Sequence, residues 1–236
     1  MSQADARTHK PDQIPDTERF IIGKDKYESS PALGDSFSWW SLGENPLSLN
    51  FSDPTIINLN NTKWKADCAV VPEERKDGWV YLVITVPETP DGPIRPILIP
   101  SCASGAFEKS THFLHLYGHD IALLAQGTNA SRTSEATLKF DNPPPRDVAL
   151  LPPGGYLIIA SKTDNTGSWL FHCHIAWHAS SGLALQILER QQDLKKLMTE
   201  ERLAEARRVC ANWDTWFKNK TNHWNSSNPF QDDSGV

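Results

Sequence analysis

The chain has 236 residues, enough for one large domain with appendages, and 39% of its residues are hydrophobic, which suffices for a packed core. Its formal net charge is −6 and no block of basic residues stands out, which argues against a nucleic-acid partner. No stretch approaches ~18 consecutive uncharged apolar residues, so we expect no segment that spans a membrane.

Residues 1–30 are polar and contain two prolines and many charges, which predicts a linker or disordered arm. The opening residues contain no apolar run and do not resemble a signal peptide. The chain nevertheless carries sequons for N-glycosylation, which favour a secreted lineage, at Asn50, Asn60, Asn129, Asn219 and Asn225. A chain that has lost its upstream part would reconcile these two observations.

From Phe37 onward the sequence consists of short apolar, aromatic and β-branched runs broken by Pro, Gly, Asn and Asp. Such runs predict strands, and many short strands separated by turn signals indicate an all-β sandwich or barrel. The predicted strands cover residues 37–42, 55–59, 79–86, 94–99, 115–124, 156–161, 168–171 and 183–188.

After Glu189 the apolar period changes from two to three or four residues, which predicts an amphipathic helix. We expect Thr199 to cap this helix, with Glu200 and Glu201 in its first turn. The residues that set the period are Leu203, Ala206, Cys210, Trp213 and Phe217. From Asn219 the sequence is polar, and we expect it to be irregular.

Six of the eight histidines fall in two short segments. The first is HFLHLYGHD at residues 112–120, and the second is HCHIAWH at residues 172–178. Because random placement would scatter eight histidines along the chain, this clustering indicates a shared chemical role.

The second segment predicts two metal sites on opposite sides of one strand. If residues 172–174 are extended, His172 and His174 face one side and Cys173 faces the other. Cys173 can then bind one metal while its neighbours bind another. His178 lies a turn beyond and can return to the Cys173 side, and His112 would complete a His₂Cys set. Two imidazoles and one thiolate in a plane are typical of a blue-copper electron-transfer site.

The axial position of such a site is usually taken by Met, but the chain has only Met1 and Met198. Leu183, five residues after His178, occupies the expected axial place. An apolar axial neighbour leaves copper three-coordinate, which favours Cu(I) and a stronger oxidant. An electron that arrives at copper on Cys173 can leave through the peptide to the neighbouring histidines, so one tripeptide joins the two sites.

The cysteines support an incomplete protein. The chain contains Cys68, Cys102, Cys173 and Cys210. If Cys173 is a metal ligand, an odd number remains, and one of these three lacks a partner within the chain.

Several segments resemble the laccase-type multicopper oxidases of fungi. HCHIAWHASSGL resembles their fourth copper motif and HFLHLYGHD is similar to their third. FSWWSLGENPLSLNFSDPTI resembles the opening of the third cupredoxin domain in ascomycete laccases, and the DSGV end resembles their tail. The match runs from about residue 37 to 236. It implies the C-terminal third of such an enzyme, with a cupredoxin-like Greek-key β-sandwich over 31–190 and a C-terminal helix and tail over 191–236.

The resemblance also implies roles for individual residues. By motif position, the type-1 copper ligands are His112, Cys173 and His178 with Leu183 axial, the type-2 ligand is His115, and the type-3 ligands are His172 and His174. Trp177 would line the place where a phenol donates its electron. In this family the C-terminal tail lies in the solvent channel, and Cys210 occupies the position of a bridge to the first domain.

Two departures from the family pattern limit what the chain does alone. Tyr117 stands where the family has a third-motif histidine, and Phe113 replaces the usual proline. The family's trinuclear cluster also takes four histidines from its first domain, and no HWH or HSH pair occurs here. We therefore expect a type-1 copper, with type-2 and type-3 copper only if missing N-terminal cupredoxin domains or a separate chain complete the ligand set.

The resulting hypothesis is a laccase-like oxidase portion that oxidises phenols in one-electron steps with O₂ as acceptor, including phenol coupling in fungal pigment or secondary-metabolite biosynthesis. Two alternatives are a single-copper cupredoxin that transfers electrons and a non-catalytic remnant. A zinc site built from Cys173, His174 and His178 is the inorganic alternative. His119 falls outside the ligand pattern and is expected to be structural, hydrogen-bonding near the site.

Overall fold

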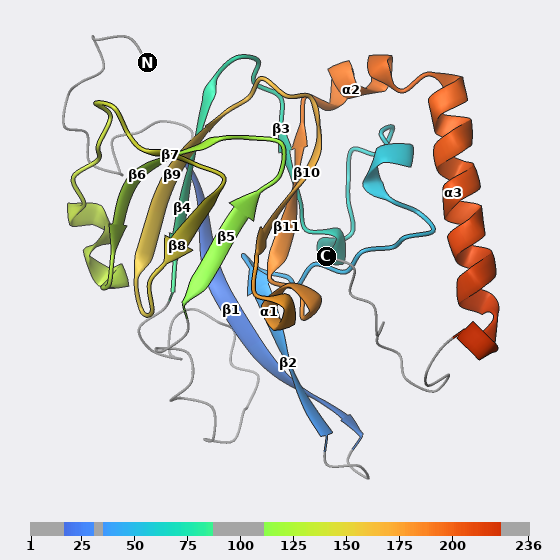
Figure 1. Ribbon diagram of the computed structural model, residues 1–236, viewed down its shortest axis with the longest axis horizontal. Helices are drawn as coiled ribbons and strands as arrows, with labels where there is room; N and C mark the ends of the chain where they lie inside the picture. The colour runs from blue at the N-terminus through green and yellow to red at the C-terminus, as the bar shows by residue number, and fades with distance from the viewer. Residues whose placement is uncertain (1–16, 31–34, 87–110, 223–236) are drawn as a thin grey trace.

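The computed structural model describes residues 17–30, 35–86 and 111–222, and its strands form two sheets (Figure 1). The six-stranded sheet has the order β2-β1-β4-β9-β6-β7. Its strands are β1 (Thr17–Ser30), β2 (Asp35–Leu42), β4 (Trp79–Thr85), β6 (Ile121–Gly127), β7 (Pro145–Arg146) and β9 (Tyr156–Lys162). The five-stranded sheet has the order β3-β11-β10-β5-β8. Its strands are β3 (Val70–Glu73), β5 (His112–Leu116), β8 (Val148–Leu151), β10 (Gly167–Cys173) and β11 (Ala184–Glu189).

The main core lies between the two sheets, because inward-facing residues of both contribute to one buried cluster. Strand β4 shows how the sequence produces this arrangement. Leu82 and Ile84 enter the main core, whereas Val83 between them enters a second core on the other face of the six-stranded sheet. Successive side chains of a strand point to opposite faces, so a continuous apolar run serves two cores. The all-β cupredoxin-like prediction is confirmed.

Strand β10 lies between β5 and β11, and its pairing with β5 determines which faces of the sheet Cys173 and the histidines occupy. Its antiparallel pairing with β5 places Cys173 opposite Leu114 and His172 opposite His115. Cys173 and Leu114 are fully buried in the main core. The two histidines therefore lie on the opposite, outer face of the five-stranded sheet.

Five predicted strands are confirmed by β2, β4, β9, β10 and β11. The prediction for residues 55–59 was wrong, since η3 (Thr55–Ile57) is a short 3-10 helix that begins after Pro54. Thr55 there donates a hydrogen bond from Oγ1 to Oε1 of Gln186 at 2.9 Å, which fixes the helix against β11. The predicted strand 94–99 lies outside the described residues.

The single strand predicted over residues 115–124 is two strands, β5 and β6, separated by a turn. Gly118 makes this turn with a φ of +72°, a conformation that favours glycine. A Cβ added at Gly118 would come within 2.7 Å of the Trp169 ring, so glycine is also required for space.

The polar arm predicted for residues 1–30 is corrected over its second half. Thr17–Ser30 forms β1, which pairs antiparallel with β2 and parallel with β4. Main-chain hydrogen bonds to the strands on both sides hold this strand in place. Such bonds do not depend on the side chains, so the polar composition of the segment did not predict them. Residues 1–16 lie outside the described residues.

Beyond the sandwich the chain forms two helices, α2 (Gln191–Leu197) and α3 (Glu200–Lys218). Thr199 caps α3 as predicted, with its side chain accepting from the Arg202 N–H and two glutamates in the first turn. In Figure 1 α3 follows α2 and lies at the edge of the molecule, with the segment that carries η3 between it and the five-stranded sheet. Phe51 contacts Trp213 of α3, with ring centroids 4.9 Å apart. Within the described part of the chain, no helix is long and apolar enough to cross a membrane.

Candidate metal centre

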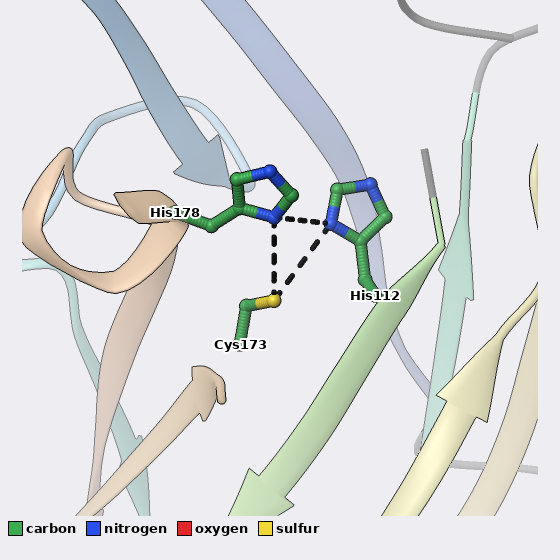
Figure 2. Close-up of side chains that lie close together, drawn as sticks. All are labelled: His112, Cys173 and His178. Atoms are coloured by element: carbon green, nitrogen blue, oxygen red, sulfur yellow. Dashed lines mark hydrogen bonds between the residues drawn. The ribbon is translucent and has the colours of Figure 1, made fainter. Parts of the chain in front are cut away.

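His112, Cys173 and His178 form a compact triad (Figure 2). The Nδ1 atoms of the two histidines are 3.2 Å apart, and Cys173 Sγ lies 3.8 Å from Nδ1 of His112 and 3.5 Å from Nδ1 of His178. His112 begins β5, Cys173 ends β10, and His178 belongs to the short helix α1 (Ala176–Ser180). Within residues 17–30, 35–86 and 111–222, no other group of three such side chains brings its ligand atoms within 4.8 Å.

The spacing of the triad fits one metal ion. An ion bonded to nitrogen at ~2.0 Å and to sulfur at ~2.3 Å, with roughly trigonal angles, separates its ligand atoms by about 3.2–3.8 Å. The three observed separations fall in this range. One soft thiolate with two imidazoles suits copper or zinc. The donor set therefore fits a mononuclear soft-metal site.

Leu183 lies beside the triad and is fully buried in the same core cluster as Cys173. The Cys173 N–H donates to the Leu183 carbonyl at 3.0 Å, and the Leu183 N–H donates to the His178 carbonyl at 2.9 Å. These main-chain bonds tie Leu183 to two of the three donors. Its place on the axis of a bound metal stays a prediction.

Burial shifts the pKa of two members of the triad, His112 and Cys173. Burial, followed by the neighbouring His178, lowers the pKa of His112 to about 3. Burial also raises the pKa of the Cys173 thiol, although the backbone N–H groups of Ile175 and Phe113 oppose the shift. Because the thiolate is the metal ligand, binding of a metal ion displaces the thiol proton.

A second group of side chains, His115, His172 and His174, gathers on the outer face of the five-stranded sheet. Ring centroids are 5.6 Å apart for His115 and His172, 5.7 Å for His115 and His174, and 5.5 Å for His172 and His174. Ligand atoms of one ion with bonds of ~2.1 Å lie at most about 4.2 Å apart. The ligand atoms of these three side chains do not all lie within 4.8 Å of one another, whereas those of the triad do. This outer imidazole cluster is therefore more open than the triad, and its spacing suits ligation of more than one ion.

Two atoms of the outer imidazole cluster fit metal ligation directly. His115 Nδ1 and His172 Nε2 are buried and have no hydrogen-bond partner. Burial lowers the pKa of both imidazoles, with His174 adding to the effect at His115. A buried, neutral imidazole nitrogen without a partner is a desolvated lone pair or N–H, and ligation of a cation would satisfy the lone pair. The other nitrogen of His172 is held by the Cys173 carbonyl at 2.9 Å.

Tyr117 lies against the outer imidazole cluster. Its ring centroid is 4.5 Å from that of His115 and 5.4 Å from that of His172, and the latter pair is stacked. The tyrosine ring is 41% exposed. Phe113, the other departure from the family motif, is exposed on β5, and its carbonyl accepts from the His174 N–H at 2.6 Å.

His119 lies apart from both groups and forms a buried ion pair with Glu189. Its Nε2 is 2.8 Å from Glu189 Oε2, and the two side chains are only 4% and 2% exposed. Burial opposes protonation, but the hydrogen bond to Glu189 outweighs it and raises the pKa of His119. The structural role expected for His119 agrees with this position. The sequence analysis did not identify Glu189 as a partner of His119, because an acidic residue at the end of a strand is usually exposed to solvent.

The tryptophans near His178 differ in exposure. Trp177, predicted to line the phenol site, belongs to α1 and is 81% exposed. Trp40 of β2 is buried, and its ring centroid lies 4.3 Å from that of His178 and 5.3 Å from that of His112. Sequence reasoning missed Trp40, because no spacing rule connects it to residues more than 70 positions away.

The two-sheet sandwich and its His₂Cys triad define a cupredoxin domain of the copper-binding class. The family model for multicopper oxidases matches residues 42–193. The chain therefore belongs to the multicopper oxidase family, and the resemblance to fungal laccases seen in the sequence is confirmed. Copper is the metal that this family implies.

Several relatives are fungal laccases. A laccase of Arthroderma benhamiae is 43% identical over 218 residues, which cover 91% of this chain and 32% of that protein. Laccase-1 of Botryotinia fuckeliana is 38% identical over 203 residues, covering 84% of this chain and 31% of the relative. The crystal structure of a laccase from Botrytis aclada superposes with a TM-score of 0.68 at 33% identity, over 93% of this chain and 35% of that one. The chain thus spans about a third of the length of these relatives.

Proposed function

We propose that this chain is the copper-carrying C-terminal portion of a laccase-type oxidase that oxidises phenols by one-electron steps and passes the electrons to dioxygen. One observation carries the proposal: Cys173 belongs to the triad, while both of its sequence neighbours belong to the outer imidazole cluster. A single tripeptide therefore connects the two sites through covalent bonds.

Within this proposal, bound copper supplies one-electron acceptance at the triad and dioxygen reduction at the outer imidazole cluster. His112, Cys173 and His178 would hold the first ion, and the burial of His112 and Cys173 would limit the access of water to it. His178 is only partly buried and follows the exposed Trp177, so this edge is where a phenol would approach. His115, His172 and His174 supply imidazoles to the outer imidazole cluster.

The overall reaction balances four phenols against one dioxygen. Each phenol loses one electron and one proton and becomes a phenoxyl radical. Four electrons and four protons convert dioxygen to two waters. Phenoxyl radicals couple with one another, which suits phenol coupling in fungal pigment or secondary-metabolite biosynthesis.

The outer imidazole cluster needs partners to complete it. It contributes three imidazoles together with Tyr117, and the chain covers only a third of its relatives. We propose that preceding cupredoxin domains, or a separate chain, supply the remaining ligands. The triad would then carry type-1 copper, and type-2 and type-3 copper would bind only in the completed assembly. Exposed sequon asparagines support a secreted lineage: Asn50, Asn60, Asn129 and Asn219.

The test is to load the purified chain with copper and record its absorption spectrum and oxygen uptake with a methoxyphenol. We expect a blue protein, from thiolate-to-Cu(II) charge transfer, that does not sustain oxygen uptake alone. Adding the two preceding domains of an active ascomycete laccase should give turnover that Cys173→Ser abolishes and Cys68→Ser does not. A well-folded wild type that stays colourless with copper would overturn the proposal.

A single-copper electron-transfer module is the second candidate. It is favoured by the triad being the one group in the described part of the chain with three ligand atoms within 4.8 Å. The number of copper ions bound per chain distinguishes the two candidate functions. An electron-transfer module binds one copper ion even when the preceding domains are supplied, whereas an oxidase portion then binds more than one. A protein that takes zinc in preference to copper, or takes neither, would favour the zinc site or the non-catalytic remnant.

A further inference from the structure

Trp40 packs its indole against both imidazoles of the triad. Its ring centroid is 4.3 Å from His178 with the planes tilted by 35°, and 5.3 Å from His112 in an edge-to-face arrangement of 68°. The side chain is 6% exposed and belongs to the same core cluster as Cys173 and Leu183. One buried side chain of β2 thus contacts two of the three donors, which come from β5 and α1.

The backbone around Trp40 is fixed to the segment that follows His178. The Trp40 N–H donates to the Ser181 carbonyl at 2.8 Å, and the Leu47 N–H donates to the Gly182 carbonyl at 3.0 Å. Gly182 has a φ of +98°, and a Cβ there would lie 2.6 Å from Pro46 Cβ and 2.9 Å from the Trp40 carbonyl oxygen. The close approach that glycine permits holds the strand and the α1 segment together, so the indole has a defined position.

Three physical effects follow from this contact. An indole beside an imidazole in a tilted or edge-to-face arrangement limits rotation of that imidazole. An imidazole that ligates a cation shares its positive charge, and an aromatic face attracts such charge. The apolar shell around a metal site also controls access of water, and therefore controls the redox potential of the metal.

We propose that Trp40 is a positioning residue of the copper site, which holds the His112 and His178 imidazoles toward Cys173 and closes that side of the triad to water. This inference rests on the proposed function, because it requires the triad to bind copper. It assigns a role to a residue that is not itself a ligand and that comes from a strand of the other sheet.

The test uses Trp40→Ala and Trp40→Phe in the 236-residue chain, with Cu(II) alone as the probe. Removing the indole admits water as an oxygen ligand, which stabilises Cu(II) over Cu(I). For Trp40→Ala we expect copper affinity to fall about 10–100-fold by chelator competition. The thiolate-to-Cu(II) band should weaken, the electron paramagnetic resonance spectrum should become tetragonal, and the reduction potential should fall. Trp40→Phe keeps an aromatic ring and should retain most of the wild-type spectrum.

Trp79→Ala is the matched control, because Trp79 is a partly buried tryptophan that packs against the second core. It should lower stability and leave the copper spectrum and potential unchanged. If Trp40→Ala does not fold, the same measurements are made on Trp40→Leu, because leucine fills part of the space without providing a ring. Wild-type affinity, spectrum and potential in the alanine or leucine variant would overturn the role of Trp40 while the proposed function stands. A wild type that binds no copper at the triad would overturn both.

Discussion

The triad and the outer imidazole cluster share one tripeptide, yet they differ in their place in the fold and in their spacing. The triad lies in the core between the sheets, and its donor atoms are 3.2–3.8 Å apart. The outer imidazole cluster lies on a sheet face beside the exposed Tyr117, with ring centroids 5.5–5.7 Å apart. A site formed in a core is completed by the fold of one chain, whereas a site on a face is left open for ligands from elsewhere.

Strand register is the cause of this difference. Cys173 pairs with Leu114 and faces the core, and His172 pairs with His115 and faces outward. A slip of one residue between β5 and β10 would exchange the two faces and destroy both sites. The buried residues on the inner face of β10 specify the register strongly, and this places the residues of the tripeptide on two opposite faces of the sheet.

The largest expected effect is the difference between removing a histidine of the triad and removing a histidine of the outer imidazole cluster. His112→Ala should abolish the blue colour and high-affinity copper binding, because it removes one of three donors from a closed site. His115→Ala should leave the colour of the isolated chain unchanged, because its imidazole belongs to the outer imidazole cluster. Absorption spectra and copper content of the two variants check this contrast. Loss of colour in both variants would contradict the separation of the two groups.

Tyr117→His should affect only the outer imidazole cluster. A neutral phenol is a poor copper ligand, whereas imidazole serves copper well. Grafted onto the first two domains of an active ascomycete laccase, the variant should bind more copper and consume oxygen several-fold faster than the Tyr117 chimera. Tyr117→Phe, which keeps the ring but offers no ligand atom, is the control. Equal copper content and equal turnover would show that Tyr117 is a competent substitute.

Breaking the His119–Glu189 pair should destabilise the turn that carries Tyr117 and leave the triad intact. Removing one partner of a buried pair costs about 3–5 kcal/mol, so His119→Leu should lower the free energy of unfolding by roughly that amount. The exposed pair of Arg132 and Glu135 serves as the control, because Arg132→Ala should cost about 0.5 kcal/mol. Urea unfolding followed by fluorescence measures both. A copper spectrum altered by His119→Leu would contradict the independence of the two regions.

The same pair predicts a pH dependence. The folded-state pKa of His119 is raised above its ordinary 6.5, so the folded chain holds this proton more tightly than the unfolded chain. The stability that protonation contributes is fully present below pH 6.5 and is lost as the pH rises through the folded-state pKa. The difference in unfolding free energy between wild type and His119→Leu should therefore shrink from pH 6 to pH 9. A constant difference would contradict this linkage.

The smallest effect concerns α3, which lies outside the sandwich and follows its last strand. Thr199→Ala removes the hydrogen bond from the Arg202 N–H, which is long at 3.4 Å, and should cost about 0.5 kcal/mol. Circular dichroism during thermal unfolding detects the loss, and copper colour should not change. Thr199→Ser, which keeps the cap, should behave as wild type. A colour change would mean that α3 supports the triad.

Sequence reasoning succeeded where local pattern decides the structure. Runs such as WVYLVIT at Trp79–Thr85 form strands because alternate apolar side chains meet two cores. The alternation of His172, Cys173 and His174 likewise follows from strand geometry alone. The HCHIAWH segment therefore placed residues on the correct faces before any tertiary contact was known.

Sequence reasoning failed where a distant partner decides. The TIINL run at residues 55–59 has strand-forming composition, yet Thr55 bonds to Gln186 and the segment turns after Pro54 instead of pairing. Strand β1 depends on main-chain pairing with β4, about 60 residues away. The contacts of Trp40 with the triad and of Glu189 with His119 are also set by packing between sheet elements, and no local period encodes them.

The hydrogen bonds that join Trp40 and Leu47 to Ser181 and Gly182 have a consequence for synthesis. During synthesis β2 leaves the ribosome before the donors Cys173 and His178. The segment to which Trp40 of β2 is hydrogen-bonded also emerges later, and more than 100 residues separate it from β2. Non-local contacts of this kind form late in folding. If the triad binds copper, that binding would therefore be a late event. A product that stops before His178 contains Trp40 but not the complete set of donors for the metal.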